Sequence, residues 1–566
     1  MKDVHKLRRT YLPESLNVNT WDDVASYYTE LTDRTIANKE ELLQWMANRS
    51  ETDAVVDEEY RWRYIRQTCN TEDETHAKVY DNFIEHIMPH WMTVTNLLNK
   101  KIAHSNFINE LDQERFFVYI RNLKAQLQLF REENIPLIQK TQLLSQEYGA
   151  IIAAMTIEHN GKEYTLPQAN ALLQQQDRTL RKAIYEKISN RRFKDRDKLN
   201  HLFAELLAIR HQIALNAGFD NYRSYIFVEM GRFDYTVQDC EQFHEAIKTE
   251  VIPLVEKIHA TRKKELAVEE LFPYDLEVNT QNLPPLQPFS SQEEFIEKSI
   301  ACLEKADPLF AECISIMHKM QHLDLDSRKG KAPGGYNMSL PEIGIPFVFM
   351  NAAGTQRDVE TLMHEAGHAV HSLLMHKLPY NFDKDITSEM AELASMSMEL
   401  MTYDGLGEFY NDNEKKRAIK THLEGIITAL PWIALIDKFQ HWIYTNPKHT
   451  SEELENKWIE LHQELSSTII NWNNYPDFRK TLWHKQLHLF EIPFYYIEYG
   501  IAQLGAIAVW RNYKQNKTQA VTDYKSALKL GYTKTIPEMY KTAGVEFNFS
   551  VSYVKELMAF LNKNLK

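Results

Sequence analysis

The chain has 566 residues, of which 43% are hydrophobic and 25% are charged, proportions that are ordinary for a soluble globular protein. Its net charge of -14 argues against a nucleic-acid-binding role, because a phosphate backbone is neutralised by a basic surface. The longest apolar run, residues 426–436, is about half of the ~20 residues that a membrane span requires, and we expect Pro431 to break it. We therefore expect no membrane partner. The length suggests several domain-sized units or one large layered helical body.

Two further features bear on the cellular setting. Residues 1–9 are followed by no apolar stretch, so we expect no signal peptide and a cytoplasmic location. The cysteines are scattered and form no C-x-x-C pair, which argues against a disulfide framework or a thiolate zinc ribbon. We expect four ordinary thiols, and the sequence gives no oligomeric state.

Most of the chain is predicted to be helical. Apolar residues recur at spacings of three and four in charged segments at 40–48, 113–132, 178–216 and 290–320. Residues 155–166 break this pattern, because Asn160-Gly161 between alternating flanks predicts a β-hairpin. Residues 323–351 are rich in proline and glycine and end in a β-like run at 347–350. The expected boundary lies near residue 195, between an N-terminal helical region, 1–195, and a second region, 196–566.

Residues 355–374 predict one amphipathic helix. Thr355 and Asp358 have the spacing of a capping box. One stripe is apolar: Val359, Leu362, Met363, Ala366, Val370, Leu373 and Leu374. A different stripe is polar: Glu360, His364, His368 and His371.

The pattern H-E-x-x-H on this helix predicts a metal site. His364 and His368 project side by side, as two imidazoles that bind one metal must. Glu365 lies beside the metal position, where a base for an activated water belongs. A third histidine ligand at the position of H-E-x-x-H-x-x-G-x-x-H is absent, because residue 374 is leucine.

A carboxylate must then be the third ligand. The next predicted helix, residues 386–400, offers Glu389, Glu392 and Glu399. Spacing alone leaves all three open, although Glu392 and Glu399 share a face two turns apart. Two histidines and one glutamate, with one position left for water, suit a catalytic zinc ion.

Four segments resemble the thimet oligopeptidase and oligoendopeptidase F family of zinc metallopeptidases, most closely its shorter bacterial oligoendopeptidase F-like members. Residues 358–371 are similar to the extended zinc motif of that family, and residues 391–399 to its second motif. Residues 326–336 resemble the glycine-rich loop before its active site, and residues 488–500 its His/Tyr segment. The match to the second motif selects Glu392 as the third ligand.

The resemblance implies a fold and an activity. The fold would be mainly α, a large multi-helix clam-like body around a deep substrate channel, with a small β element next to the zinc helix. Both regions, 1–195 and 196–566, would form parts of this body, and 196–566 would be the catalytic one. The activity would be cleavage of internal bonds in short peptides, with one Zn²⁺ held by His364, His368 and Glu392.

In this scheme zinc polarises a water, and Glu365 takes its proton and passes it to the leaving amine. Donors to the developing oxyanion would come from the His/Tyr segment. The resemblance assigns this role to His488, Tyr496 and Tyr499, with Tyr495 as the alternative to Tyr496. An aromatic cluster at helical spacing is also common in protein cores.

Residues around the metal site could have supporting roles, and two interpretations remain open for each of them. Glu360 or Glu399 accepts the other ring N–H of His364, or is a solvated helix carboxylate. Residues 347–351 pair with an extended peptide, or form a buried strand that stiffens the loop.

Two rival functions remain open. A zinc carboxypeptidase on the same scaffold would need a cationic anchor, and Arg328, Lys329 and Lys331 are candidates. A non-catalytic binding protein would keep the metal but has no need of the base Glu365.

Overall fold

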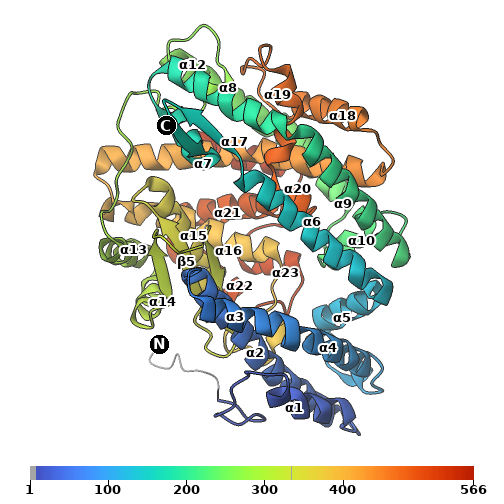
Figure 1. The fold of residues 1–566 in the computed structure, drawn as a ribbon. Helices are drawn as coiled ribbons and strands as arrows, with labels where there is room; N and C mark the ends of the chain where they lie inside the picture. The colour runs from blue at the N-terminus through green and yellow to red at the C-terminus, as the bar shows by residue number, and fades with distance from the viewer. Residues whose placement is uncertain (1–7, 333, 566) are drawn as a thin grey trace. The chain divides into compact units, whose positions relative to one another are not determined.

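The computed structural model describes residues 8–332 and 334–565. Residues 1–7, on which the signal-peptide expectation rests, and Pro333 of the glycine-rich loop lie outside these ranges. The described chain is mostly α-helical, with five short strands (Figure 1). The expected mainly α fold is confirmed.

The chain forms two compact units, and each unit is assembled from separate stretches. Unit 1 contains Met1–Gln128, Leu286–Ile419 and Gly505–Phe547, and unit 2 contains Leu129–Pro285, Lys420–Leu504 and Asn548–Lys566. Residue 195, where the sequence suggested a boundary, lies inside unit 2 between two consecutive helices. Composition along the chain does not reveal this division, because neither unit is continuous in sequence.

The helices of unit 1 share that unit with a three-stranded sheet. They are α1 (Asp22–Asp33), α2 (Lys39–Cys69), α3 (Glu74–Asn82), α4 (Met88–Ala103), α5 (Phe117–Leu129), α13 (Gln292–Ala306), α14 (Pro308–Lys319), α15 (Gln356–Met375), α16 (Ser388–Met401), α22 (Lys517–Leu528) and α23 (Ile536–Thr542). A buried cluster that includes Tyr28, Trp45 and Phe83 forms the core of the N-terminal helices.

Unit 2 is built almost entirely from helices. They are α6 (Ile135–Ala153), α7 (Leu166–Ala171), α8 (Arg178–Lys194), α9 (Arg196–Asn216), α10 (Tyr222–Glu229), α11 (Val237–Ala246), α12 (Ile252–Glu265), α18 (Ser451–Glu464), α19 (Pro476–Lys480), α20 (Leu487–Glu491) and α24 (Val551–Asn564). Two long helices, α17 (Asp412–Thr445) and α21 (Ile497–Gln515), contribute residues to both units, and the last residue of α5, Leu129, belongs to unit 2.

Two of the predicted helical segments are divided by aspartates. Residues 178–216 form α8 and α9, which meet at Asp195. Residues 290–320 form α13 and α14, and Asp307 starts the second helix by accepting a hydrogen bond from the backbone N–H of Leu309 at 2.9 Å. Pro308 follows at the first helical position, where its missing N–H costs nothing.

The predicted hairpin is confirmed. Strands β1 (Thr156–His159) and β2 (Lys162–Thr165) pair antiparallel. The turn residues Asn160 and Gly161 have φ values of 52° and 73°, the left-handed conformation that a two-residue type I′ turn needs.

The predicted β element next to the zinc helix is also present. Strand β5 (Phe347–Ala352) lies between β3 (Leu323–Asp326), to which it is parallel, and β4 (Tyr336–Met338), to which it is antiparallel. The first four residues of β5 are buried. Both edges of this strand are occupied at Val348 and Phe349, which favours the buried strand over pairing with a substrate peptide.

Within the described residues, one helix, α17, is long and apolar enough to cross a membrane by length and composition. Half of its most apolar window is buried inside the protein, and a core helix passes the same test, so this is weak evidence for a span. Pro431 lies inside this helix and does not end it, contrary to the break that the sequence suggested.

Candidate metal and catalytic site

The H-E-x-x-H motif lies on α15, in unit 1. The predicted capping box is confirmed, since Thr355 Oγ1 accepts from the backbone N–H of Asp358 and Asp358 Oδ2 accepts from the backbone N–H of Thr355. The helix packs against α16, which carries the candidate carboxylates. Gly367 permits this approach, because a Cβ there would lie 2.5 Å from Ser395 Cα and 2.6 Å from Ala394 O.

The structure brings His364, His368 and Glu392 together. One donor atom from each lies within 4.8 Å of the donor atoms of the other two. The Nε2 of His364 is 3.3 Å from Glu392 Oε2. Ser395 Oγ, three residues after Glu392, donates to the same carboxylate oxygen at 3.1 Å. Ser395 was not predicted from the sequence, although its spacing of three from Glu392 on the helix was the available signal.

The other ring nitrogen of His364 is held by Glu399. Its Nδ1 lies 2.6 Å from Glu399 Oε1, so Nδ1 carries the proton and Nε2 is left to bind a metal. Burial opposes a charge on His364, but hydrogen bonds to Glu392 and Glu399 raise its pKa well above the ordinary value. Without a metal, the His364 ring is therefore protonated and hydrogen-bonds to both carboxylates.

Glu360, the alternative partner of His364, has a different contact. Its Oε1 accepts from Gln356 Nε2 at 2.7 Å, one turn earlier on the same helix. Glu389 also lies outside the donor group, although it is buried on α16. Helical spacing did not show which of the three carboxylates is the third ligand. Their positions distinguish them, because Glu392 is among the metal donors and Glu399 contacts the other ring nitrogen of His364.

Glu365 is buried beside this group. Only 9% of it is exposed, and its Oε2 has no hydrogen-bond partner among the described residues. Burial raises the pKa of Glu365 to about 7, against a lowering effect of His364. Its backbone carbonyl accepts from Asn337 Nδ2 of β4 at 3.1 Å, a contact that the sequence did not indicate. The carboxylate is therefore in the position and the state that suit proton transfer near neutral pH.

The two remaining histidines of the helix differ in surroundings. Burial lowers the pKa of His368 to about 4, so its ring is neutral and able to bind a metal at pH 7. His371 is 1% exposed and packs in the core, where burial lowers its pKa to about 3. His371 therefore shares the predicted stripe with the ligands, but it is buried in the core.

The raised pKa of Glu365 predicts a pH-dependent stability of the metal-free protein. A carboxyl that titrates near 4.5 when unfolded and near 7 when folded costs stability above pH 7 and costs nothing below pH 4.5. Glutamine cannot ionise, so metal-free Glu365→Gln protein should melt at a higher temperature than the metal-free wild type at pH 8. This difference should shrink as the pH falls and vanish near pH 4.5. An equal difference at both pH values would contradict the assignment.

The packing of Gly367 predicts a linked loss of stability and metal. Alanine there meets backbone atoms of α16, so the helices must separate, at a cost of about 1–3 kcal/mol. Thermal unfolding should show a lower Tm, and zinc affinity should fall because the donors lie on both helices. Gly425→Ala is the matched control, since a Cβ at that helical glycine meets nothing within 4 Å. A Gly367→Ala protein with unchanged Tm and zinc affinity would rule this role out.

The His/Tyr segment forms its own cluster in unit 2. The His488 ring lies 4.8 Å from that of Tyr496 and 5.9 Å from those of Tyr495 and Tyr499, between centroids. Both Tyr495 and Tyr496 are therefore neighbours of His488, and the geometry does not choose between them. Burial raises the pKa of Tyr496, which keeps its phenol protonated and able to donate.

The proton of His488 is placed by a short chain of hydrogen bonds. Trp432 Nε1 donates to Gln486 Oε1 at 2.8 Å, which fixes the orientation of that amide. Gln486 Nε2 then donates to His488 Nδ1 at 2.7 Å. Burial lowers the pKa of His488, so the ring is neutral and its proton lies on Nε2. His488 is thereby prepared as a hydrogen-bond donor.

The cations that a carboxypeptidase would need are largely occupied. Arg328 contacts both carboxylate oxygens of Asp324. Lys331 Nζ donates to Asp324 Oδ1 at 2.9 Å and to the backbone carbonyl oxygens of Asp324, Asp326 and Met350. Lys329 is exposed and lies 3.6 Å from a carboxylate oxygen of Glu72. Two of the three candidates therefore stabilise the loop.

The donor set fits a zinc ion. Two imidazole nitrogens and one carboxylate oxygen converge, and hydrogen bonds fix His364 and Glu392 from behind. Glu365, which follows His364 in the chain, is buried with one oxygen unpartnered, and its carboxylate interacts with the charges of His364 and Glu392. Such a site can hold a metal with a water and a base beside it.

The chain is similar to known proteins in sequence and in fold. A sequence model of "Peptidase family M3" matches residues 171–559, and one of "Peptidase M3 N-terminal domain" matches residues 15–130. An oligoendopeptidase F homolog of Borreliella burgdorferi is 24% identical over 471 residues, which cover 81% of this chain and 75% of that protein. A 3.1 Å structure described as oligoendopeptidase F has a TM-score of 0.87 and 26% identity, over 99% of this chain and 98% of the other. PZ peptidase A with an inhibitor has a TM-score of 0.86 and 25% identity, over 99% of both chains.

Proposed function

Because this chain belongs to peptidase family M3, and is thus a metallopeptidase with a catalytic metal, we propose that it is a zinc-dependent endopeptidase that cleaves internal bonds of short peptides. The observation that carries this proposal is the buried Glu365 carboxylate, with one unpartnered oxygen, beside the donors of His364, His368 and Glu392. The names of the similar proteins, which include oligoendopeptidase F and oligopeptidase PepF, support short peptides as the substrate class.

His364, His368 and Glu392 would hold the metal. A zinc ion held there would supply Lewis-acid chemistry for the scissile carbonyl and the attacking water. Glu365 accepts the proton of that water, which its raised pKa favours, and donates it to the leaving amine. Glu399 keeps His364 in one tautomer throughout, through the hydrogen bond at Nδ1.

The remaining groups orient substrate and stabilise charge. His488 and the neighbouring tyrosines Tyr496 and Tyr499 are our candidates for donors to the oxyanion, since His488 carries its proton on Nε2 and Tyr496 remains a phenol. Strand β4 is an edge strand, and its Asn337 contacts the carbonyl of Glu365. An extended peptide paired with β4 would therefore run along α15, next to the base.

Cleavage of a peptide blocked at both ends tests the proposal. The protein should cut the blocked peptide at internal bonds, and a chelator should abolish the cleavage. A carboxypeptidase would leave the blocked peptide intact and trim a free C-terminus one residue at a time, an activity disfavoured by the occupied Arg328 and Lys331. Binding of a broad peptide library without any cleavage would favour a non-catalytic binding protein. Either result would overturn the proposal.

A further inference from the structure

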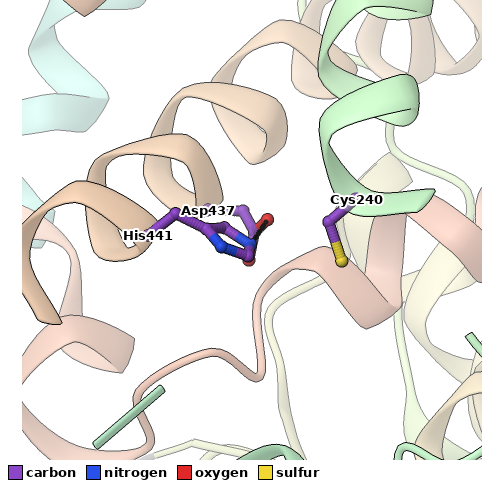
Figure 2. Close-up of side chains that lie close together, drawn as sticks. All are labelled: Cys240, Asp437 and His441. Carbon is purple, nitrogen blue, oxygen red and sulfur yellow. Dashed lines mark ion pairs between the residues drawn. The ribbon is translucent and has the colours of Figure 1, made fainter. Parts of the chain in front are cut away.

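A second group of metal-binding side chains lies in unit 2. Cys240 comes from α11, and Asp437 and His441 come from α17 (Figure 2). One donor atom from each lies within 4.8 Å of the other two, the same closeness as in the His364 group. These are the two such groups in the part of the chain that the structure describes.

All three residues are buried. Cys240 is 1% exposed, Asp437 is 0% exposed and His441 is 7% exposed. Asp437 Oδ1 and His441 Nε2 have no hydrogen-bond partner among the described residues. The His441 Nε2 atom lies 3.1 Å from Asp437 Oδ2, in ion-pair contact. Buried polar atoms are normally hydrogen-bonded, so the lack of a hydrogen-bond partner at these two atoms needs an explanation.

The neighbouring side chains hold the Asp437 carboxylate in position and do not neutralise its charge. His244, one turn after Cys240 on α11, lies with Nε2 2.8 Å from Asp437 Oδ2. This contact satisfies one carboxylate oxygen and leaves Oδ1 free. Arg223 Nη1 lies 3.4 Å from His441 Nδ1, and Arg232 pairs with Glu498 at 2.9 Å. Hydrogen-bonded carboxylate ligands of this kind are typical of metal sites.

We infer that Cys240, Asp437 and His441 form a second metal site, which takes a thiophilic divalent cation such as Zn²⁺ and joins α11 to α17. Thiolate, carboxylate and imidazole are all zinc ligands, and the thiolate selects against hard cations such as Mg²⁺. Two anionic ligands and a neutral imidazole balance a charge of +2, so the loaded site is neutral and compatible with complete burial. Binding would release the thiol proton of Cys240 to solvent.

This site differs in chemistry from the one on α15. It includes a sulfur donor, whereas the His364, His368 and Glu392 group has none. Its donors are buried and come from helices far apart in sequence, so a bound ion would tie α11 to α17. The sequence signal was available as pairs spaced four apart, C-x-x-x-H at 240–244 and D-x-x-x-H at 437–441, although the absence of C-x-x-C had favoured ordinary thiols.

Cobalt substitution of the full-length protein tests the inference. Co²⁺ bound to a thiolate gives a charge-transfer band in the near ultraviolet that nitrogen and oxygen ligands do not give. The wild-type protein loaded with Co²⁺ should show this band. Absence of the band from the wild type would overturn the inference, and this measurement needs no variant.

Variants show which site gives the charge-transfer band and how many metal ions the protein binds. Cys240→Ser should lose the band and one of two bound ions, whereas His368→Ala should keep the band and lose the other ion. Cys313→Ser is the matched control, because Cys313 is also fully buried but lies outside both donor groups, and it should keep the band. A band that survives Cys240→Ser, or an unchanged metal content in that variant, would identify the cluster as a metal-free hydrogen-bonded network and contradict the inference.

Discussion

Replacement of Glu365 by glutamine is expected to lower kcat on a doubly blocked peptide by about 100- to 10,000-fold, the range that a positioned general base contributes. Glutamine has nearly the same shape but cannot accept the proton of the attacking water. Because Glu365 is not among the metal donors, bound zinc should stay at the wild-type level. Steady-state kinetics and metal analysis of the same sample measure both quantities.

Glu360→Gln is the matched control for this experiment. It changes a carboxylate on the same helix whose contact is with Gln356, away from the donor group. Its kcat should remain close to that of the wild type. Equal activity of Glu365→Gln and the wild type, in zinc-loaded protein, would remove Glu365 from the mechanism and leave the metal site standing.

Replacement of Glu392 by alanine is expected to remove zinc and with it all measurable cleavage. One of the three donors is lost, and His364 Nε2 loses the carboxylate 3.3 Å away. Zinc titration of the metal-free protein should show no tight binding at this site. Circular dichroism is needed alongside, to show that the helices persist.

Glu399→Ala separates binding from positioning. Glu399 contacts His364 Nδ1 but is not a donor, so its removal should weaken zinc affinity by about 10–100-fold without abolishing it. Excess zinc should restore much of the activity in this variant and none in Glu392→Ala. Rescue of Glu392→Ala by excess zinc would show that the third ligand is a different carboxylate.

Much of the metal helix could be predicted from the sequence, because its features are local. The capping residues Thr355 and Asp358 and the side-by-side histidines follow from helical spacing alone. The third ligand does not, since Glu389, Glu392 and Glu399 lie on one helix and only the packing against α15 distinguishes them. Family resemblance supplied Glu392, and the structure places its carboxylate beside His364.

Features that depend on neighbouring elements could not be predicted. His371 lies on the same stripe as the ligands in a single helix, but helix packing buries it. Strand β5 was predicted from its β-like run of residues, but nothing in that run indicates that β5 pairs with β3 on one side and with β4 on the other. The division into two units could not be predicted from composition for a similar reason, because stretches far apart in the chain pack together.

Anomalous scattering at the zinc edge, from crystals of protein that cleaves the blocked peptide, tests the central claim most directly. We expect a peak bonded to His364, His368 and Glu392, with the Glu365 carboxylate next to it and not bonded to it. Active protein with no peak among these residues, or with Glu365 as a ligand, would contradict it.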